Sequence, residues 1–172
     1  MITIDGGTGK IMHNGINVAP TPMVDQWRIT SAKSNSGQSV FDANWERNDT
    51  SSSLYGSNGM SESSGIFTFP STGIYLITFS GYATGNSDRY IGVWIERTIN
   101  NSDYTRVSEG YGSAYNSGAS TYVQVSHECT FDVTDTSTHK IRFKTDNVGT
   151  CSWDGSSTIQ RSGALFTRLG DT

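Results

Sequence analysis

The sequence has few of the residues on which several classes of protein depend. Only two of its 172 residues are cysteines, 16% are charged and 34% are hydrophobic. The two cysteines, Cys129 and Cys151, allow one disulfide at most, which excludes a disulfide framework and leaves their pairing open. No apolar run approaches the length of a membrane span, and the N-terminus lacks the basic and apolar segments of a secretory signal. We therefore expect no membrane insertion.

Basic residues are also scarce, because the net charge is −4 and the isoelectric point is about 5.2. A protein that binds nucleic acid needs a clustered basic face for the phosphates. The densest basic run is Lys140, Arg142 and Lys144, which alternates with Ile141 and Phe143. This alternation is typical of the solvent face of one strand. We expect no nucleic-acid partner.

Glycine is abundant, with 19 residues, and Ser, Thr and Asn form long tracts. Few windows contain several helix-forming residues, whereas short alternating runs recur between turn signals. A domain of about 150 residues buries roughly 70% of its unfolded surface, so the length suits one domain and a tail. The sequence therefore predicts an all-β fold, an antiparallel two-sheet sandwich or jelly roll of eight or more strands.

The segment from residue 65 to residue 84 has the clearest organisation. Phe67 and Phe69 alternate with Thr68, the segment 70–73 (Pro-Ser-Thr-Gly) breaks the chain, and a longer apolar run begins at Ile74. Both alternating sets of that run are largely apolar, which predicts a strand covered on both faces. One set is Ile74, Leu76 and Tyr82, and the other is Tyr75, Ile77, Phe79 and Ala83.

The run Gly-x-Phe-x-Phe-Pro-x-x-Gly-Ile-Tyr in this segment resembles the signature region of the C1q/TNF-like jelly rolls. In that family an aromatic strand meets a Pro/Gly corner, and the next strand is buried at a threefold axis. The resemblance implies a jelly roll over residues 24–172, with the last strand, 164–169, beside the first. It also implies a homotrimer, whose interface we expect at Tyr75, Ile77 and Phe79.

The rest of the body is predicted to alternate between strands and polar loops. We expect strands at 89–98 and 121–133, the second forming a hairpin with 139–145. The segments 48–64, 109–120 and 146–160 are rich in Gly, Ser and Asn and are interpreted as long outward loops. The tyrosines of 109–120 suit an adaptable recognition surface, although tyrosines lying flat on the domain would give the same pattern.

Residues 1–23 differ from the body, because three very short apolar pieces are separated by turn signals. Such a segment is too small to fold alone and would add its strands to another sheet. We interpret it as a docking arm with a hinge at 19–22, and a disordered tail is the alternative. The residues expected to anchor the arm to its partner are Ile2, Ile4, Ile11, Ile16 and Val18.

No motif indicates catalysis, a cofactor or a metal. His13, His127 and His139 lack the local spacing of zinc ligands, and we expect His127 to be buried with its hydrogen bonds satisfied. No Gly-x-Ser-x-Gly nucleophile elbow occurs. The glycine-rich run 6–10 lacks the first glycine and the Ser or Thr of a phosphate loop. We therefore expect no catalytic residues and no cofactor.

The sequence contains acidic residues that suit two kinds of site. Glu62, Glu109 and Asp154 are loop carboxylates that could pair for glycoside hydrolysis, although nothing selects two of them. Asp146, Asn147 and Asp154 could hold calcium, as some C1q-like modules do, but they form no EF-hand ladder. The sequence therefore predicts no metal site.

The absence of catalytic motifs, the short arm and the Ser/Thr/Gly/Asn-rich jelly roll favour a non-enzymatic structural or adhesion protein. This combination resembles minor virion proteins of tailed bacteriophages, such as capsid decorations, fibres or tail-associated knobs. That resemblance implies a location in the virion and a capsid or tail protein as partner of the arm. The alternative is a carbohydrate-binding, lectin-like module that recognises a host surface glycan through Tyr111, Tyr115 and Trp153. A hydrolase acting on surface polysaccharide is the third hypothesis.

Overall fold

The structure is a computed structural model that describes residues 2–4, 11–13, 16–17, 23–50, 54–56, 58–85, 88–115 and 121–172. These residues form fifteen β-strands and contain no helix. Accordingly, no helix in the described part of the chain is long and apolar enough to cross a membrane. Every strand pair of the body is antiparallel, and the prediction of an all-β antiparallel sandwich is confirmed.

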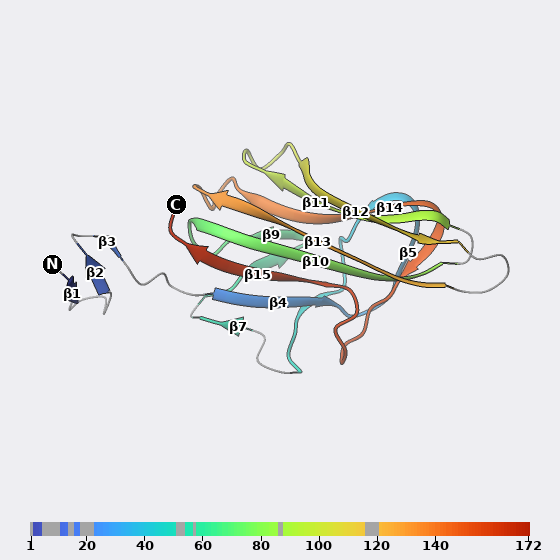
Figure 1. Cartoon of the computed structure of the whole chain (residues 1–172), viewed down its shortest axis with the longest axis horizontal. Helices are drawn as coiled ribbons and strands as arrows, with labels where there is room; N and C mark the ends of the chain where they lie inside the picture. The colour runs from blue at the N-terminus through green and yellow to red at the C-terminus, as the bar shows by residue number, and fades with distance from the viewer. Residues whose placement is uncertain are drawn as a thin grey trace.

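One layer of the sandwich, the β10 layer, is built around the longest apolar run of the sequence. Its strand order is β13 (Thr121–Val133), β10 (Gly73–Gly85), β15 (Gly163–Gly170) and β4 (Met23–Ile29). The short strands β6 (Trp45–Arg47) and β7 (Leu54–Tyr55) extend this layer beyond β4. The last strand therefore lies beside the first strand of the body, as the resemblance implied (Figure 1).

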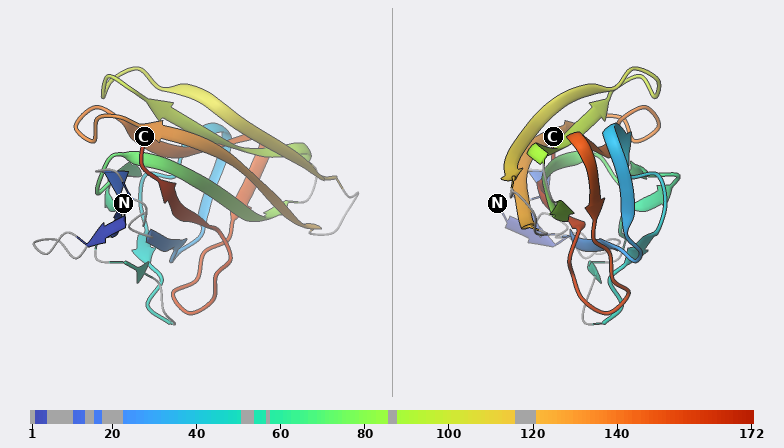
Figure 2. Two further views of the ribbon diagram at one scale, coloured as in Figure 1. Left: turned by 60° about the vertical axis from the view of Figure 1, so that its left-hand side comes forward. Right: turned by 90° about the vertical axis from the view of Figure 1, so that its right-hand side faces the viewer.

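The second layer, the β11 layer, has the order β12 (Thr105–Ala114), β11 (Asp88–Thr98) and β14 (Lys140–Trp153). Beyond β14 lie β5 (Lys33–Val40) and, end to end with it, β9 (Ile66–Thr68), which also pairs with β8 (Ser61–Ser63). Figure 2 shows the strands of both layers curling around the core. The layers share hydrogen bonds at one corner, where Ala83 and Thr84 of β10 pair with Trp153 and Ser152 of β14.

Aromatic rings fill the space between the layers. Phe79 of β10 stacks on Phe143 of β14 with ring centroids 4.5 Å apart, and Trp45 meets Phe67 edge-on at 4.8 Å. Offset and edge-on ring pairs of this kind add to the free energy gained by burying the rings. The Pro/Gly corner carries the chain from β9 in one layer to β10 in the other. Gly73 has φ +145° there, and a Cβ atom would lie 2.6 Å from the carbonyl oxygen of Gly170.

The predicted hairpin of 121–133 with 139–145 is wrong. β13 pairs with β10, whereas β14 pairs with β11 in the other layer, so the intervening turn crosses the sandwich. The three predicted loops are also partly wrong, because residues 105–114 and 146–153 belong to strands β12 and β14 and the segment 48–64 contains the short strands β7 and β8. The glycines of β12 face β13, and a Cβ atom on Gly112 would lie 2.7 Å from Cγ1 of Val123. Close packing against β13 therefore explains why this strand reads as a loop.

The arm forms a small sheet of its own from β1 (Ile2–Ile4), β2 (Ile11–His13) and β3 (Ile16–Asn17). Among the described residues, these three strands pair only with one another, and they lie beyond one end of the sandwich (Figure 1). The side chains of Ile2 and Ile4 are 71% and 72% exposed. The side chains of Ile11 and Ile16, the whole of Val18 and the predicted hinge lie outside the described residues.

Candidate functional site on two outward faces

The predicted trimer contacts Tyr75, Ile77 and Phe79 are buried inside one chain. All three are 0% exposed in the isolated chain, and the Tyr75 hydroxyl donates to the carbonyl oxygen of Ser71 at 2.9 Å. A second copy therefore has no access to these side chains, and the prediction that they form an interface is corrected. Alternation along β10 placed the more aromatic set in the core, which leaves the other set facing outward.

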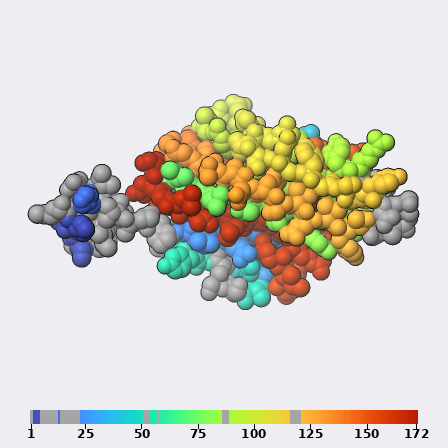
Figure 3. All heavy atoms as spheres, in the orientation of Figure 1, coloured from blue at the N-terminus to red at the C-terminus, as the bar shows by residue number. Residues whose placement is uncertain are grey.

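The outward face of the β10 layer carries that other set. Ile74, Leu76 and Thr78 alternate along β10, and the last two pair directly with Thr167 and Leu165 of β15. Directly paired residues share a face of the sheet, so these side chains form one continuous surface. Ile74 is 37% exposed and Leu165 is 36% exposed. In Figure 3 strands β13, β10 and β15 lie open on this side, with no other segment across them.

Exposed tyrosines lie at both ends of this face. Tyr82 of β10 and Tyr122 of β13 stack with centroids 5.9 Å apart, and Tyr122 is 65% exposed. At the β4 side, Val24 pairs with Tyr55, which is 66% exposed. The outward side chains of β10 and β15 include no charged group. Charge lies at the borders of this face, at Glu128 and Asp132 of β13 and, beyond β15, where Arg28 of β4 pairs with Glu46 and Asp49.

The outward face of the β11 layer has a different chemistry, centred on Trp94 of β11. The guanidinium of Arg106 lies 4.2 Å from the centroid of the Trp94 ring, and the ammonium of Lys144 lies 5.1 Å from it. Glu96, two residues along β11, accepts a hydrogen bond from Nε of Arg142 at 2.6 Å. The cations lie over the indole ring, and carboxylates pair with the cations of this cluster. Trp94 is therefore only 6% exposed.

Tyr111 of β12 links this cluster to β14. Its hydroxyl accepts a hydrogen bond from Nε1 of Trp94 at 3.0 Å and donates one to Oδ2 of Asp146 at 3.1 Å. The Tyr111 ring crosses Gly92 of β11, where a Cβ atom would come within 2.5 Å of two ring carbons. Burial raises the pKa of Tyr111, despite the opposing bond from Trp94, so its hydroxyl remains a donor at neutral pH.

Tyr90, Tyr111 and Asp146 line a shallow depression of about 330 Å³. The two tyrosine rings meet edge to face, with centroids 5.4 Å apart and an interplanar angle of 83°. Tyr90 is 40% exposed and Tyr111 is 46% exposed. The three come from three strands, and they converge because Gly92 pairs with Tyr111 on one side and with Asp146 on the other.

Of the three predicted ligand contacts, only Tyr111 lies in this depression. Tyr115 is 65% exposed but does not line it. Trp153 is 0% exposed, and its Nε1 donates to Oδ1 of Asn147 at 3.3 Å inside the sandwich. The prediction for Trp153 is therefore wrong, because residues 146–153 continue β14 and turn that indole inward. Tyr90 and Asp146 were not predicted as ligand contacts.

The three acidic residues that were candidates for glycoside hydrolysis each contact a different partner. Glu62 accepts from the amide of Gly65, Glu109 pairs with Arg106, and Asp154 lies 3.5 Å from Arg161.

The residues considered for calcium do not converge either. Asp146 faces outward to Tyr111, whereas its neighbour Asn147 is buried and bonds to Trp153. Within the described ranges, no group of three or more His, Cys, Asp or Glu side chains is arranged to hold a metal ion.

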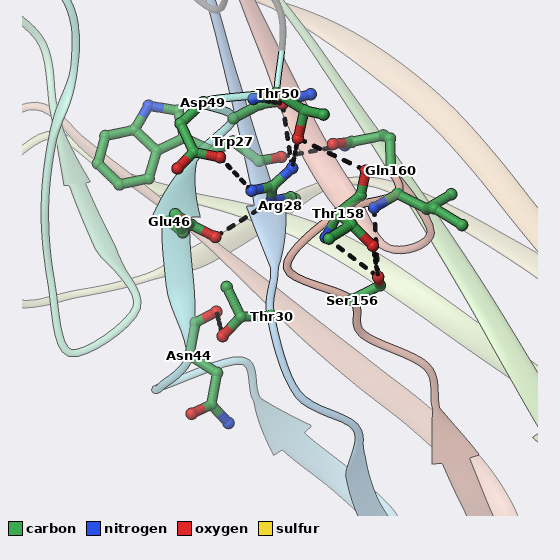
Figure 4. Close-up of polar contacts among 12 residues, drawn as sticks. Trp27, Arg28, Thr30, Asn44, Glu46, Asp49, Thr50, Ser156, Thr158 and Gln160 are labelled. Atoms are coloured by element: carbon green, nitrogen blue, oxygen red, sulfur yellow. Dashed lines mark hydrogen bonds and ion pairs between the residues drawn. The ribbon is translucent and has the colours of Figure 1, made fainter.

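A buried cation at the lower edge of the molecule has a structural role. The Arg28 side chain of β4 is 0% exposed, and Figure 4 shows its guanidinium held by Glu46, Asp49 and Thr50. Asn48 also accepts from it, so all three guanidinium nitrogens are engaged. Since the Arg28 side chain is fully buried, this network fastens the segment 48–50 to β4 and gives a ligand no access to the guanidinium.

His127 of β13 lies where that strand packs on β12. Both ring nitrogens are buried and have no hydrogen-bond partner among the described residues, so the expectation of satisfied hydrogen bonds is wrong. Burial lowers the pKa of His127, and the nearby carboxylate of Glu109 opposes this only in part. Burial also raises the pKa of the neighbouring Cys129 thiol to about 11. No disulfide joins Cys129 and Cys151.

Comparison with solved structures identifies the architecture. Murine APRIL is similar with a TM-score of 0.63 and 15% identity, over 86% of this chain and 99% of that one. Eiger TNF from S. frugiperda is similar with a TM-score of 0.63 and 14% identity, over 90% and 96% of the two chains. No family model and no curated protein matches the sequence. At these identities the likeness shows a TNF-like jelly-roll fold, and a fold of this kind hosts many functions.

Proposed function

We propose that this protein is a non-enzymatic structural and adhesion component that assembles as a homotrimer through the outward face of the β10 layer. The observation that carries the proposal is the open, uncharged surface around Leu76 and Leu165. Exposed apolar surface of this kind marks a site of association. The threefold arrangement is what the resemblance to the C1q/TNF-like jelly rolls implies.

This face has the distribution of apolar and polar side chains that an interface between copies shows. A stable interface buries about 800 Å² on each partner, with an apolar centre and a polar rim. The β10 layer has that order, because leucine, isoleucine and threonine side chains lie centrally and Glu128 and Asp132 lie on the border strand β13. The stacked Tyr82 and Tyr122 add aromatic contact area at one end.

We further propose that the assembly is part of a tailed-bacteriophage virion, as a capsid decoration, fibre or tail-associated knob. The separate sheet β1–β3 supports this reading, because its exposed isoleucines Ile2 and Ile4 face no strand of the body. Short strands with open edges can pair with a strand of another protein. The arm, with Ile11, Ile16 and Val18 as its further anchors, would then bind a capsid or tail protein.

Light scattering tests the oligomer directly. The full chain at micromolar concentration should have a mass three times the 18.7 kDa of one subunit. Leu76→Asp and Leu165→Asp each place a charge in the interface, and both variants should be monomeric. Val107→Asp is the matched control, because Val107 on β12 is 37% exposed and lies in the other layer; it should remain trimeric. A monomeric parent protein, or dissociation caused equally by Val107→Asp, would refute the proposal.

A second candidate function is recognition of a carbohydrate by the β11 layer. It is favoured by the depression between Tyr90, Tyr111 and Asp146, where exposed rings and a carboxylate share one surface. This function is compatible with a trimer, since the depression and the uncharged face belong to different layers.

A further inference from the structure

We infer that the depression formed by Tyr90, Tyr111 and Asp146 binds one neutral sugar ring. The inference rests on the second candidate function and does not depend on the trimer. It assigns a role to two residues, Tyr90 and Asp146, that lie on separate strands and meet only through the pairing of β11 with β14.

The two tyrosine rings supply the apolar part of the site. Sugar rings have a face made of C–H groups, and such a face packs on an aromatic ring. Here the rings of Tyr90 and Tyr111 stand at 83° to each other and both are partly exposed. One ring can therefore contact the face of a sugar while the other borders its edge. Tyrosine provides this contact area with little loss of side-chain entropy.

Asp146 supplies the polar part. Its Oδ2 atom accepts from the Tyr111 hydroxyl at 3.1 Å, and a carboxylate can accept several hydrogen bonds. Asp146 is half-buried, and it forms no ion pair with the described lysine and arginine side chains. Hydroxyl groups can donate hydrogen bonds to the Asp146 lone pairs that Tyr111 does not use. Adjacent hydroxyls of a sugar are donors at the required spacing.

The charge around the depression favours a neutral ligand. Near the depression, the cations of Arg106, Arg142 and Lys144 lie among the carboxylates of Glu96, Glu109 and Asp146. Glu109 is paired with Arg106 and Glu96 with Arg142, while Lys144 lies between Glu96 and the Trp94 ring. A cationic ligand at Asp146 would have Lys144 close by on the same strand, and an anionic ligand would meet Asp146 itself. A sugar without charge avoids both costs.

The site is held rigidly before a ligand arrives. Tyr111 is fixed by Trp94, by Asp146 and by its position across Gly92. Tyr111 and Asp146 both pair directly with Gly92, and Tyr90 lies on β11 two residues before it. Sites built on regular elements are held more accurately than sites on loops. Little ordering entropy would therefore be lost when a ligand binds.

The test uses the full chain and a defined set of probes. Saturation-transfer NMR is recorded with the methyl glycosides of glucose, galactose, mannose and N-acetylglucosamine, and a glycan array adds neutral and sialylated oligosaccharides. At least one neutral probe should bind. Tyr90→Ala and Asp146→Asn should each weaken that binding at least tenfold. The matched controls Tyr115→Ala and Asp132→Asn remove an exposed tyrosine and an exposed carboxylate elsewhere, and they should bind normally.

The outcomes separate the site from the oligomer. Light scattering on the same samples shows whether each variant keeps the parent mass, so lost binding in an intact assembly isolates the site. The inference is overturned if no neutral sugar binds, or if binding survives both substitutions. It is also overturned if tetramethylammonium or lysine methyl ester binds at Asp146 and no sugar does. Circular dichroism confirms that each variant is folded.

Discussion

The outward faces of the two layers differ in how far their aromatic and apolar side chains are exposed to solvent. On the β11 layer Trp94 is 6% exposed, because Arg106, Lys144 and Tyr111 cover it from the same surface. On the β10 layer Tyr122 is 65% exposed, and no charged side chain covers its central strands. A face whose charged and aromatic side chains pair with one another is stable in water. A face with exposed apolar side chains gains free energy when a second protein surface covers it.

This difference shows that the two faces of one sandwich can serve separate purposes. Salt bridges and cation–π contacts fix the side chains of the β11 layer, which suits a pre-formed ligand site. Leucine, isoleucine and threonine dominate the β10 face, and they gain free energy mainly by losing contact with water. Substitutions should therefore change folding stability on one face and assembly on the other.

The largest expected effect is at Trp94. Trp94→Ala removes a nearly buried indole and its hydrogen bond to Tyr111, and we expect it to lower the free energy of unfolding by about 3 kcal/mol. Tyr122→Ala on the other face should lower it by less than about 1 kcal/mol. Urea unfolding of both variants in the Leu76→Asp background compares the faces without the contribution of assembly. Equal losses would remove the distinction between the two faces.

A smaller effect is expected at Glu96. Its carboxylate is 7% exposed and bonds to Arg142, which the neutral amide of Glu96→Gln would leave without a counter-charge. The expected loss is about 1–2 kcal/mol in the free energy of unfolding, since hydrogen bonds to charged groups contribute about 1.5–3 kcal/mol.

Glu128→Gln is the matched change on the exposed border of the β10 layer, and it should alter stability by no more than about 0.5 kcal/mol. Chemical denaturation in low and high salt measures both variants. If Glu128→Gln proved the more damaging change, the β10 layer and not the β11 layer would be the electrostatically organised face.

The smallest expected effect is a pH dependence at the edge where β12 packs on β13. The His127 imidazole has a pKa of about 6.5 in an unfolded chain, and burial lowers this pKa in the folded protein. Below about pH 6.5 the unfolded chain therefore binds a proton that the folded chain does not, and stability falls with decreasing pH until the folded pKa is passed. Above pH 6.5 both states are neutral and this dependence vanishes.

Urea midpoints at pH 7.5, 6.5 and 5.5 measure this dependence, which His127→Leu should reduce. The lowered pKa values of Asp42 and Asp135 act in a more acidic window, below their ordinary value of 3.8. Their contribution is present above that value and is lost as the pH falls through the folded pKa. An unchanged slope between pH 7.5 and 5.5 in His127→Leu would assign the dependence to other groups.

Much of the fold was predictable, because alternation depends on local sequence alone. The strands at 121–133 and 74–83 and the corner at 70–73 follow directly from apolar periodicity and from Pro and Gly. The partner of each strand did not follow, since pairing is decided by tertiary contacts. Thus 139–145 was assigned to the wrong layer, and β12 was missed because its inward positions Gly110 and Gly112 make room for His127 and Val123.

The site was less predictable than the fold. Tyr111 was recognised as a candidate contact from its loop-like surroundings, but Tyr90 and Asp146 join it only through the register at Gly92. No feature of local sequence reports such a register. The prediction that Tyr75, Ile77 and Phe79 face another subunit failed for a related reason, because both alternating sets of β10 are apolar and sequence alone does not show which one fills the core.

The short ladder between β10 and β14 at residues 83–84 and 152–153 ties the two layers into one hydrogen-bonded body. A trimer built on one layer would therefore hold three copies of the opposite layer at set separations and tilts. Weak recognition by each copy would add up on a densely glycosylated surface, because after the first contact the others become intramolecular events at high effective concentration. The pairing of β10 with β14 inside each subunit would thereby determine the avidity of the whole trimer.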